Sequence, residues 1–387
     1  MRRTGWVCFF MLFLFSFMLT ACDDGPYEVV FEDHDGEEIE VVEVLKGESL
    51  EGPTPSRDGF VFEGWVKEGT VKEVPFTFEY EEDITLTAQW VPNGIDYDVT
   101  DEGVVIRAYT GDKFELELPA TIKGRSLVKI GEEAFAGTSI TSVHIPESIT
   151  RIGASAFYEA ASLEQVTFEE NSELKVIEGA IGTRGAFEQT TALSEITLPA
   201  SVERIGRAAF RHSALETVDF AQDAALEVIG VGAFGHTSLS EVHIPAGVEV
   251  LEPHAFEKIP SLETVTFAED SALKRIEQGV FANTSLTGIE IPADVEYIGA
   301  SAFTHTFELS SFTFEGDAVK TIGMDAFWNA MALEEIHIPS SVTEIGMNAF
   351  NGADFLTIYT AHESKPEGWH EDWNPDGLDV HWGVEKE

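Results

Sequence analysis

One short phrase recurs along most of this chain and limits the folds open to it. The phrase ends in an apolar residue followed by phenylalanine, and successive phrases lie 22 to 25 residues apart, except for one interval of 30 residues. A unit of this length cannot bury its own apolar face, so neighbouring units must stack and share one core. The sequence therefore predicts a solenoid of about ten units. The ten phenylalanines are Phe135, Phe157, Phe187, Phe210, Phe234, Phe256, Phe281, Phe303, Phe327 and Phe350.

A second pattern lies between these phenylalanines and has the form Leu-x-x-Val-x-Ile. Leu239, Val242 and Ile244 are one example. The alternation predicts one short strand per unit, with these three side chains pointing inward. The glycine of the Ile-Gly step that precedes most of these phenylalanines is expected to supply a tight corner. The fold class predicted is mainly β.

The units alternate between two kinds of strand ending. In one kind the strand ends in Ile-Pro or Leu-Pro, and the proline closes the strand because it has no N–H to donate. In the other kind the strand ends in phenylalanine and continues into an acidic loop. The long interval of 30 residues predicts an insertion around Gly179 to Gly185 that bulges from the stack. The Pro-type endings lie at residues 145–146, 198–199, 244–245, 291–292 and 338–339, and the Phe-type endings at Phe168, Phe220, Phe267 and Phe314.

The combined phrase, Ile-Gly-x-x-Ala-Phe followed by Leu-x-x-Val-x-Ile-Pro, resembles the BspA-like leucine-rich repeat family of bacterial surface proteins. The resemblance covers roughly residues 95–387. We expect residues 95–130 to form an N-terminal cap, residues 130–355 the leucine-rich repeats, and the Trp-rich residues 356–387 a C-terminal cap, since the ends of a solenoid otherwise expose core and open strand edges. The resemblance implies a role in adhesion to host matrix proteins or to other cells.

A smaller β domain is predicted before the solenoid, over residues 27–92. Strand-like runs are broken there by turn residues such as Asp35-Gly36 and Gly52-Pro53, and no helical period appears. The segment from residue 55 to Trp65 and the segment from Ile84 to Trp90 resemble the Listeria-Bacteroides repeat, also called the internalin B-repeat. This resemblance implies a compact β-grasp-like fold that serves as a spacer or an adhesive module on bacterial surface proteins.

The N-terminus has the features of an export signal. Two arginines precede an apolar run of about 13 residues, which is too short to span a bilayer as a helix. The run ends in Leu-Thr-Ala-Cys at residues 19–22, which resembles the bacterial lipobox. We therefore expect residues 1–21 to be a lipoprotein signal peptide, Cys22 to carry the lipid, and residues 22–26 to form a tether. An ordinary secretory signal that happens to contain a cysteine is the alternative.

The charge of the chain excludes two classes of partner. With 70 acidic and 23 basic residues, the formal net charge is −47 at pH 7. Nucleic acid and anionic lipid surfaces would both be repelled, because proteins bind them by neutralising phosphates with lysine and arginine. The lipid anchor is therefore the only membrane contact expected. Affinity for a basic partner should fall as ionic strength rises.

Three motifs suggest chemistry but fit other roles better. Residues 230–235 match G-x-G-x-x-G, yet they occupy the register of the repeat phrase and no strand-helix-strand unit surrounds them. Ser155 lies in the same phrase and is not a nucleophile elbow. Asp33 to Gly36 could begin a calcium loop, but Asp-Gly between apolar runs favours a hairpin turn. We therefore predict no enzymatic activity, no catalytic residue, no cofactor and no metal site.

One residue of each predicted strand should point outward, and stacking would align these residues into a surface stripe. Successive histidines of the stripe would lie four units apart, or about 19 Å, which is too far for one metal ion. Threonine is common in strands in general, so the stripe is either an ordinary polar surface or a candidate binding face. Its members are His144, Thr167, Thr197, Asp219, His243, Thr266, Glu290, Thr313 and His337.

Taken together, the sequence predicts an exported, membrane-anchored bacterial lipoprotein at the cell surface. Its solenoid would bind an extracellular protein or another cell-surface macromolecule, with adhesion as the role. A passive envelope spacer and a carbohydrate-binding surface module are the alternatives, and an enzymatic site in the insertion around Gly179 to Gly185 is a third.

Overall fold

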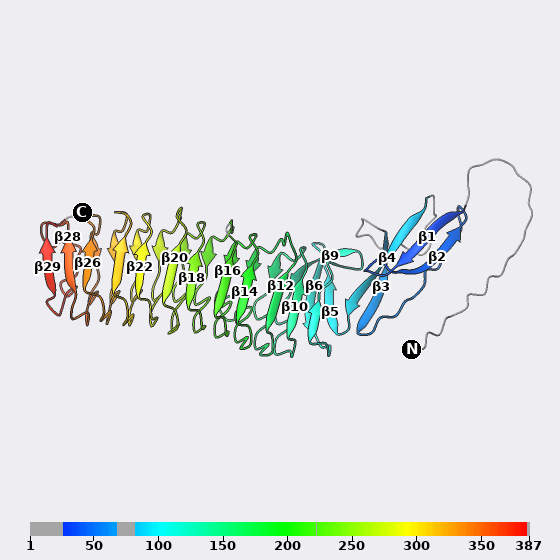
Figure 1. The fold of residues 1–387 in the computed structure, drawn as a ribbon, viewed down its shortest axis with the longest axis horizontal. Helices are drawn as coiled ribbons and strands as arrows, with labels where there is room; N and C mark the ends of the chain where they lie inside the picture. Colours follow the sequence, from blue (N-terminus) through cyan, green and yellow to red (C-terminus); the bar gives the residue numbers. More distant parts are fainter. Residues whose placement is uncertain (1–25, 68–81, 222, 385–387) are drawn as a thin grey trace, which may run out of the picture.

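The computed structural model describes residues 26–67, 82–221 and 223–384. The predicted signal peptide, Cys22 and most of the predicted tether therefore lie outside the described residues. All regular elements within these ranges are β-strands, so the mainly β prediction is confirmed. Within the same ranges, no helix combines the length and the apolar character needed to cross a membrane. Figure 1 shows a small sheet followed by a long stack of strands.

The N-terminal domain is a four-stranded mixed sheet with the strand order β2-β1-β4-β3. The two central strands, β1 and β4, are parallel, and each has an antiparallel partner on its outer side. The predicted hairpin turn at Asp35-Gly36 is confirmed, since it joins β1 to β2. The strands are β1 (Tyr27–Glu32), β2 (Glu38–Val44), β3 (Phe60–Lys67) and β4 (Ile84–Pro92).

The small core of this domain is built around Trp65, which is 1% exposed. The ring of Phe31 meets it edge-on, with centroids 4.8 Å apart, and Phe62 meets it at 5.3 Å. The indole N–H donates to the carbonyl oxygen of Pro53 at 3.0 Å, so the segment between β2 and β3 is bonded to the core residue. A large aromatic with its polar atom satisfied supplies much of the apolar area in a domain of this size.

The solenoid begins with five strands of irregular length. Strand β8 pairs with β9, β5 pairs with β6, and β6 pairs with β9, which starts the main stack. Val91 of the preceding domain already belongs to the solenoid core. These strands are β5 (Ile95–Val99), β6 (Val104–Tyr109), β7 (Glu115–Glu117), β8 (Thr121–Ile122) and β9 (Arg125–Ile130).

Each repeat contributes two strands, whereas the sequence predicted one. The second is a two-residue strand that ends at an aliphatic residue followed by glycine or glutamate, and these short strands build one thirteen-stranded sheet together with β5, β6, β8 and β9. Two residues are too few to show an alternating pattern, which is why the prediction was wrong. The short strands are β11 (Arg151–Ile152), β13 (Val176–Ile177), β15 (Arg204–Ile205), β17 (Val228–Ile229), β19 (Val250–Leu251), β21 (Arg275–Ile276), β23 (Tyr297–Ile298), β25 (Thr321–Ile322) and β27 (Glu344–Ile345).

The longer strands form the opposite side of the stack. They are the predicted Val-x-Ile segments, and they run from the N-terminal lead-in to the C-terminal end. These strands are β7, β10 (Ser142–Ile145), β12 (Gln165–Phe168), β14 (Glu195–Leu198), β16 (Thr217–Phe220), β18 (Glu241–Ile244), β20 (Thr264–Phe267), β22 (Gly288–Ile291), β24 (Ser311–Phe314), β26 (Glu335–Ile338), β28 (Thr357–Thr360) and β29 (Asp379–Trp382).

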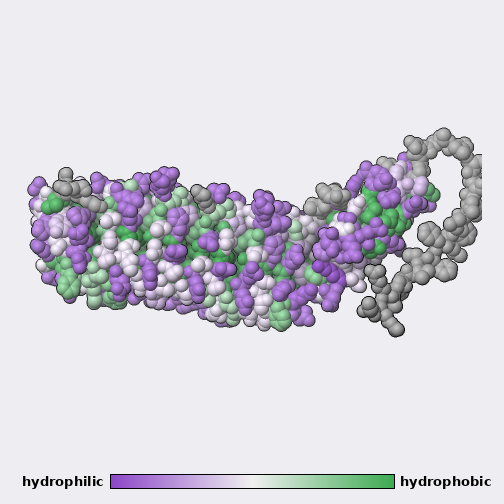
Figure 2. All heavy atoms as spheres, in the orientation of Figure 1, coloured by the Kyte–Doolittle hydropathy of each residue, from purple (hydrophilic) through white to green (hydrophobic). Residues whose placement is uncertain are grey.

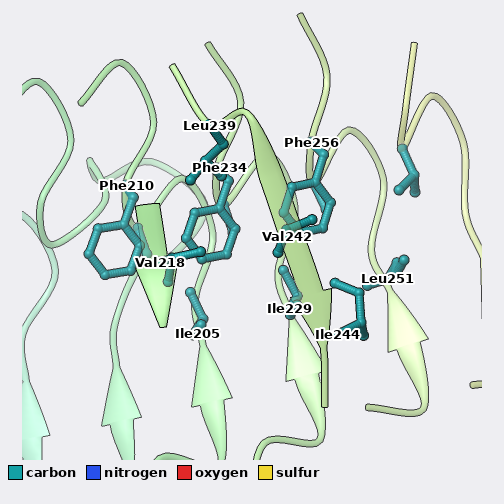
Figure 3. Close-up of a cluster of buried hydrophobic side chains, with 14 of the residues drawn as sticks. Ile205, Phe210, Val218, Ile229, Phe234, Leu239, Val242, Ile244, Leu251 and Phe256 are labelled. Carbon is teal, nitrogen blue, oxygen red and sulfur yellow. The ribbon is translucent and has the colours of Figure 1, made fainter. Parts of the chain in front are cut away.

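A single column of phenylalanine rings runs through the core between the two sides. Neighbouring rings of the ten repeat phenylalanines are stacked with centroids 4.9 to 5.8 Å apart. Figure 3 shows three of them, Phe210, Phe234 and Phe256, in a row, with Ile205 and Ile229 of two short strands lying below Phe234 and Phe256. Tyr109 contacts the first ring of the column and Trp373 the last, at 5.7 and 6.0 Å. The stability of the solenoid is thus spread along its length.

The glycines of the Ile-Gly step act through close approach and not through a left-handed corner. A Cβ built on Gly230 would lie 2.8 Å from the backbone of Gly206 in the preceding repeat. Left-handed backbone instead falls two residues before and two residues after the phenylalanine, for example at Ala208 (φ 53°) and His212 (φ 58°) on either side of Phe210. We call the turn around each repeat phenylalanine, such as residues 206–212, the anchor turn.

Candidate binding surface

The outward residues of the longer strands form one surface, which we call the strand face. In β18, Val242 and Ile244 are buried while Glu241 and His243 are exposed, and the other longer strands of the repeats follow the same alternation. All nine residues of the predicted stripe lie at the third position of such a strand, half-buried or exposed. Figure 2 shows hydrophilic residues along the whole visible length of the solenoid.

Cross-strand contacts connect members of the stripe in pairs. The Nδ1 atom of His144 lies 2.9 Å from the hydroxyl oxygen of Thr167, and His243 makes the same contact with Thr266 at 2.9 Å. Both pairs join a Pro-type strand to the Phe-type strand that follows it. In each pair the histidine therefore has Nδ1 within hydrogen-bond distance of a threonine hydroxyl, and its Nε2 atom can bind a partner.

The hydrogen bonding between the strands of the strand face is interrupted. Strand pairs that begin with a Pro-type strand are hydrogen-bonded over four residues: β10-β12, β14-β16, β18-β20 and β22-β24. In contrast, β12 and β14, β16 and β18, and β24 and β26 belong to separate sheets, and β20 pairs with β22 at only one position. The strand face is thus divided into hydrogen-bonded blocks: β7-β10-β12, β14-β16, β18-β20-β22-β24 and β26-β28-β29.

Proline explains this division. After a Phe-type strand the next backbone N–H donates back to the Pro-type strand, as Glu169 does to Ile145 at 2.9 Å and Ala268 to Ile244 at 3.0 Å. The equivalent donor after β14 would be Pro199, which has no N–H. One ladder bond is therefore missing wherever a Pro-type strand follows a Phe-type strand, and at three of these four steps the two strands belong to separate sheets.

Grooves lie at three of these separations. The largest, between β12 and β14, has a volume of about 830 Å³ and includes Glu169, Glu195 and Asp219 in its lining. The groove between β24 and β26 has about 390 Å³, and the one between β16 and β18 about 240 Å³. Carboxylates line all three grooves, and no lysine or arginine of the described residues does so. The grooves are thus sites of negative potential.

The strand face continues beyond the predicted stripe at its C-terminal end. Tyr359 of β28 and His381 of β29 take the positions that follow His337. The three rings are stacked, with centroids 4.8 and 4.9 Å apart. Tyr359 and His381 were not predicted as part of the stripe, because β28 ends in threonine and β29 lies in the Trp-rich segment, outside the repeat phrase. The aliphatic residue at the second position of β28, Ile358, was the available signal.

The predicted insertion does project from the stack. Ile181 at its tip is 92% exposed, and Gly182 has a left-handed backbone. Arg184 at its base pairs with Glu188 at 3.6 Å and lies over the ring of Tyr158 at 5.4 Å. These contacts fix the base of the loop, and they engage the guanidinium of Arg184 in a structural role.

A carboxylate at the edge of the stack illustrates how the acidic residues are used. Burial acts to raise the pKa of Glu178, but hydrogen bonds and charge from Arg151 and Lys129 outweigh it and lower that pKa. The carboxylate lies 2.7 Å from Arg151 and 3.3 Å from Lys129. This ion pair spans three successive repeats and remains formed at neutral pH.

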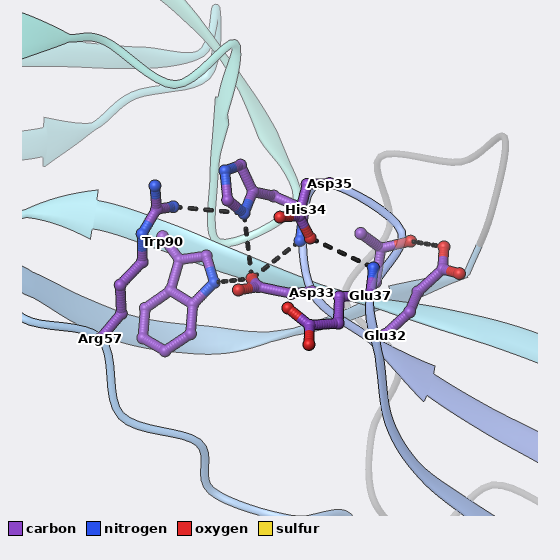
Figure 4. A network of polar contacts seen from close by, with 8 residues as sticks. Glu32, Asp33, His34, Asp35, Glu37, Arg57 and Trp90 are labelled. Carbon is purple, nitrogen blue, oxygen red and sulfur yellow. Dashed lines mark hydrogen bonds and ion pairs between the residues drawn. The ribbon is translucent and has the colours of Figure 1, made fainter. Parts of the chain in front are cut away.

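The hairpin turn of the small domain gathers three potential metal ligands, from Asp33, His34 and Asp35, within 4.8 Å of one another. Figure 4 shows how they are used. Asp33 accepts hydrogen bonds from the indole N–H of Trp90 and from the backbone N–H of His34, and its backbone closes the turn to Gly36. These contacts correspond to a structural turn.

The family of the repeats follows from comparison with known families. A model of the BspA type leucine-rich repeat region matches residues 116–226, 180–272 and 227–357, and these ranges together cover more than half of the chain. The chain belongs to the BspA-type leucine-rich repeat family. The Listeria-Bacteroides repeat domain matches residues 27–89. Both family resemblances predicted from the sequence are confirmed.

The chain is similar to several bacterial proteins of known structure. A leucine-rich cell surface protein of Faecalibacterium prausnitzii is 23% identical, with a TM-score of 0.40 over 76% of this chain and 95% of that one. The pneumococcal vaccine antigen PcpA is 19% identical, with a TM-score of 0.41 over 81% and 88%. The leucine-rich repeat protein of T. pallidum is 20% identical, with a TM-score of 0.38 over 62% and 88%. No curated protein matches the chain significantly.

Proposed function

We propose that this BspA-type chain is an exported bacterial surface protein whose strand face binds a basic extracellular protein, in adhesion to host matrix or to other cells. The main support for this proposal is the set of acidic grooves between β12 and β14, between β16 and β18, and between β24 and β26. These grooves expose carboxylates such as Glu195 and Asp219 on a surface whose buried side belongs to a continuous core. A rigid, repetitive and acidic surface suits a large partner with several lysines or arginines.

The architecture supports a binding role more than a catalytic one. The outward residues are threonines, histidines and carboxylates at strand positions that repeat along the stack, so contacts with a partner would be distributed over many units. Protein-sized interfaces bury about 800 Å² per partner. Several neighbouring blocks of the strand face are needed for an interface of that size.

The experiment is a binding assay of the exported chain against a panel of purified host matrix proteins and a glycan array. We expect saturable binding to at least one basic matrix protein, with an affinity that falls as sodium chloride rises from 50 to 500 mM, because surface charges are screened within about 10 Å at 0.1 M salt. Binding to glycans alone would favour a carbohydrate-binding module. No binding to any member of the panel would favour a passive spacer and contradict the proposal.

We also propose that Cys22 carries the lipid anchor. The support is the Leu-Thr-Ala-Cys sequence directly after an apolar run of export-signal length. The test is metabolic labelling with a radioactive fatty acid in cells that express the wild type or Cys22→Ser. Label in the wild type and none in the variant is the expected result. Label in neither protein would point to an ordinary secretory signal, and protease treatment of intact cells then reports surface exposure separately.

A further inference from the structure

A hollow of about 180 Å³ lies on the anchor turns of three successive repeats, separate from the grooves of the strand face. The first repeat contributes Arg207 and Arg211 to its lining, the second contributes His236, and the third contributes His254 and Glu257. We call this site the basic hollow. Its lining contrasts with that of the three acidic grooves.

Two glycines of the middle repeat create the hollow. Gly235 takes the position that Arg211 and Glu257 hold in the flanking repeats, and Gly232 takes the position of Ala208 and His254. A Cβ on Gly232, where φ is +62°, would meet no atom within 4 Å. Both glycines belong to the G-x-G-x-x-G match at residues 230–235. The match has no dinucleotide role here, but its glycines leave space beside two arginines.

Among the described residues, the side chains of Arg207 and Arg211 have no hydrogen-bond, ion-pair or ring partner. Every other lysine and arginine of the described residues interacts with some partner; for example, Arg204 of the same repeat pairs with Glu252 at 3.4 Å. Acidic residues outnumber basic ones three to one in this chain, so two adjacent arginines without a counter-charge are unusual. Arg211 is also half-buried, and a partly desolvated guanidinium without a partner is costly.

The groups around the two arginines do not neutralise them. The rings of His212 and His236 stack with centroids 4.3 Å apart. Burial lowers the pKa of both, and the charge of Arg211 lowers it further, which favours the neutral form of the rings. The carboxylate in the lining, Glu257, lies 3.3 Å from Lys258 and 3.1 Å from His254. The positive charge at the hollow is therefore that of the two arginines.

We propose that the basic hollow binds one tetrahedral oxyanion, a phosphate or sulfate group, between Arg207, Arg211 and His236. Guanidinium groups bind such oxyanions through parallel N–H donors, and the ring N–H of His236 supplies a further donor. The net charge of −47 repels a polyanion, so the group is carried by a small molecule such as the free ion or a phosphorylated or sulfated monosaccharide. The hollow has room for one such group and a few waters.

The test is isothermal titration of the full chain with sodium phosphate, sodium sulfate and a sugar monophosphate at constant ionic strength. Four proteins are compared: the wild type, Arg211→Gln, Gly235→Val and the control Arg204→Gln, with folding of each checked by circular dichroism. The control removes a positive charge from the same repeat but outside the hollow. A Cβ on Gly235 would have only ordinary contacts, at 3.5 Å or more, so Gly235→Val fills the hollow while keeping both arginines.

We expect saturable binding of at least one of the three ligands by the wild type and by Arg204→Gln, and at least tenfold weaker binding by Arg211→Gln and Gly235→Val. The sugar ester binding more tightly than the free ions would identify the carrier, and equal affinities would identify the free anion as sufficient. Either result supports the proposal. It is overturned if the wild type binds none of the three ligands, or if Gly235→Val binds as the wild type does, since affinity would then depend on surface charge and not on the hollow.

Discussion

The backbone N–H of Glu169 donates to the carbonyl oxygen of Ile145 across 2.9 Å. This bond joins β12 to β10 at the end of a hydrogen-bonded block, and the same position one repeat later is Pro199, which cannot donate. A proline in place of the donor therefore weakens the ladder where neighbouring blocks of the strand face separate. The acidic grooves between blocks follow from it.

Replacing Glu169 by proline should remove this bond. The variant leaves the carbonyl oxygen of the buried Ile145 without its partner, so we expect a loss of roughly 1–3 kcal/mol in the free energy of unfolding. Urea denaturation followed by circular dichroism measures the change. Glu169→Ala is the matched control, because both variants lose the side-chain contact with the N–H of Glu147 while only proline removes the backbone donor. Equal stability of the two variants would contradict the role assigned to the bond.

The phenylalanine column should be sensitive to truncation in its middle. Phe234 stacks between Phe210 and Phe256 at 5.3 Å on each side and is completely buried. We expect Phe234→Ala to cost about 3–5 kcal/mol, because it leaves a cavity in a closely packed core. Phe355→Ala is the control: this side chain is 76% exposed, and its loss should change stability by no more than about 0.5 kcal/mol. The prediction fails if both variants unfold at the wild-type urea concentration.

The stacked histidines His212 and His236 predict a pH dependence of stability. Burial, followed by the charges of Arg211 and Lys258, lowers the pKa of these rings below the ordinary value of 6.5, while Glu188 and Glu257 act in the opposite direction. Below about pH 6.5 the unfolded chain therefore binds more protons than the folded chain, and the free energy of unfolding falls as the pH falls. Above about pH 6.5 the histidines are neutral in both the folded and the unfolded chain, so they no longer reduce the free energy of unfolding.

The double variant His212→Asn with His236→Asn should lose this part of the pH profile. Thermal unfolding between pH 7.5 and pH 5.5 measures it, above the range in which most carboxylates titrate. We expect the wild type to lose more stability over this range than the variant does. Parallel profiles of the two proteins would show that the histidines are not the titrating groups.

The repeat architecture was predictable from sequence because it depends on spacing. The column of buried rings follows directly from the ten regularly placed phenylalanines. The Pro-type and Phe-type endings can also be recognised in the sequence. The separation of strands that they cause cannot, because it depends on which strand accepts the hydrogen bond from each backbone N–H. The alignment of the outward residues could be predicted from the spacing, but the separation of the strands that carry them could not.

The short strands, the C-terminal end of the strand face and the basic hollow were not predicted from the sequence, because the local patterns there are too short or resemble another motif. Two-residue strands such as β17 have no detectable period. Tyr359 and His381 extend the strand face from a segment without the repeat phrase. The basic hollow depends on Gly232 and Gly235, whose motif fits no dinucleotide site and becomes informative only when the flanking repeats are placed beside it.

The central claim is that a basic protein binds the strand face, and a matched pair of charge reversals tests it most directly. Asp219→Lys with Glu290→Lys changes two exposed carboxylates of the strand face. Glu227→Lys with Glu249→Lys changes two exposed carboxylates that precede short strands on the other side. The net charge rises equally in both variants, so the comparison separates position from total charge. The assay measures the dissociation constant of each variant for the matrix protein that binds the wild type most tightly.

We predict at least tenfold weaker binding by the strand-face variant, and binding within about twofold of the wild type by the control. A loss of 1.4 kcal/mol corresponds to the tenfold change. Equal losses in both variants would show that only the overall charge attracts the partner. Unchanged binding by the strand-face variant would contradict the claim that this face is the binding surface.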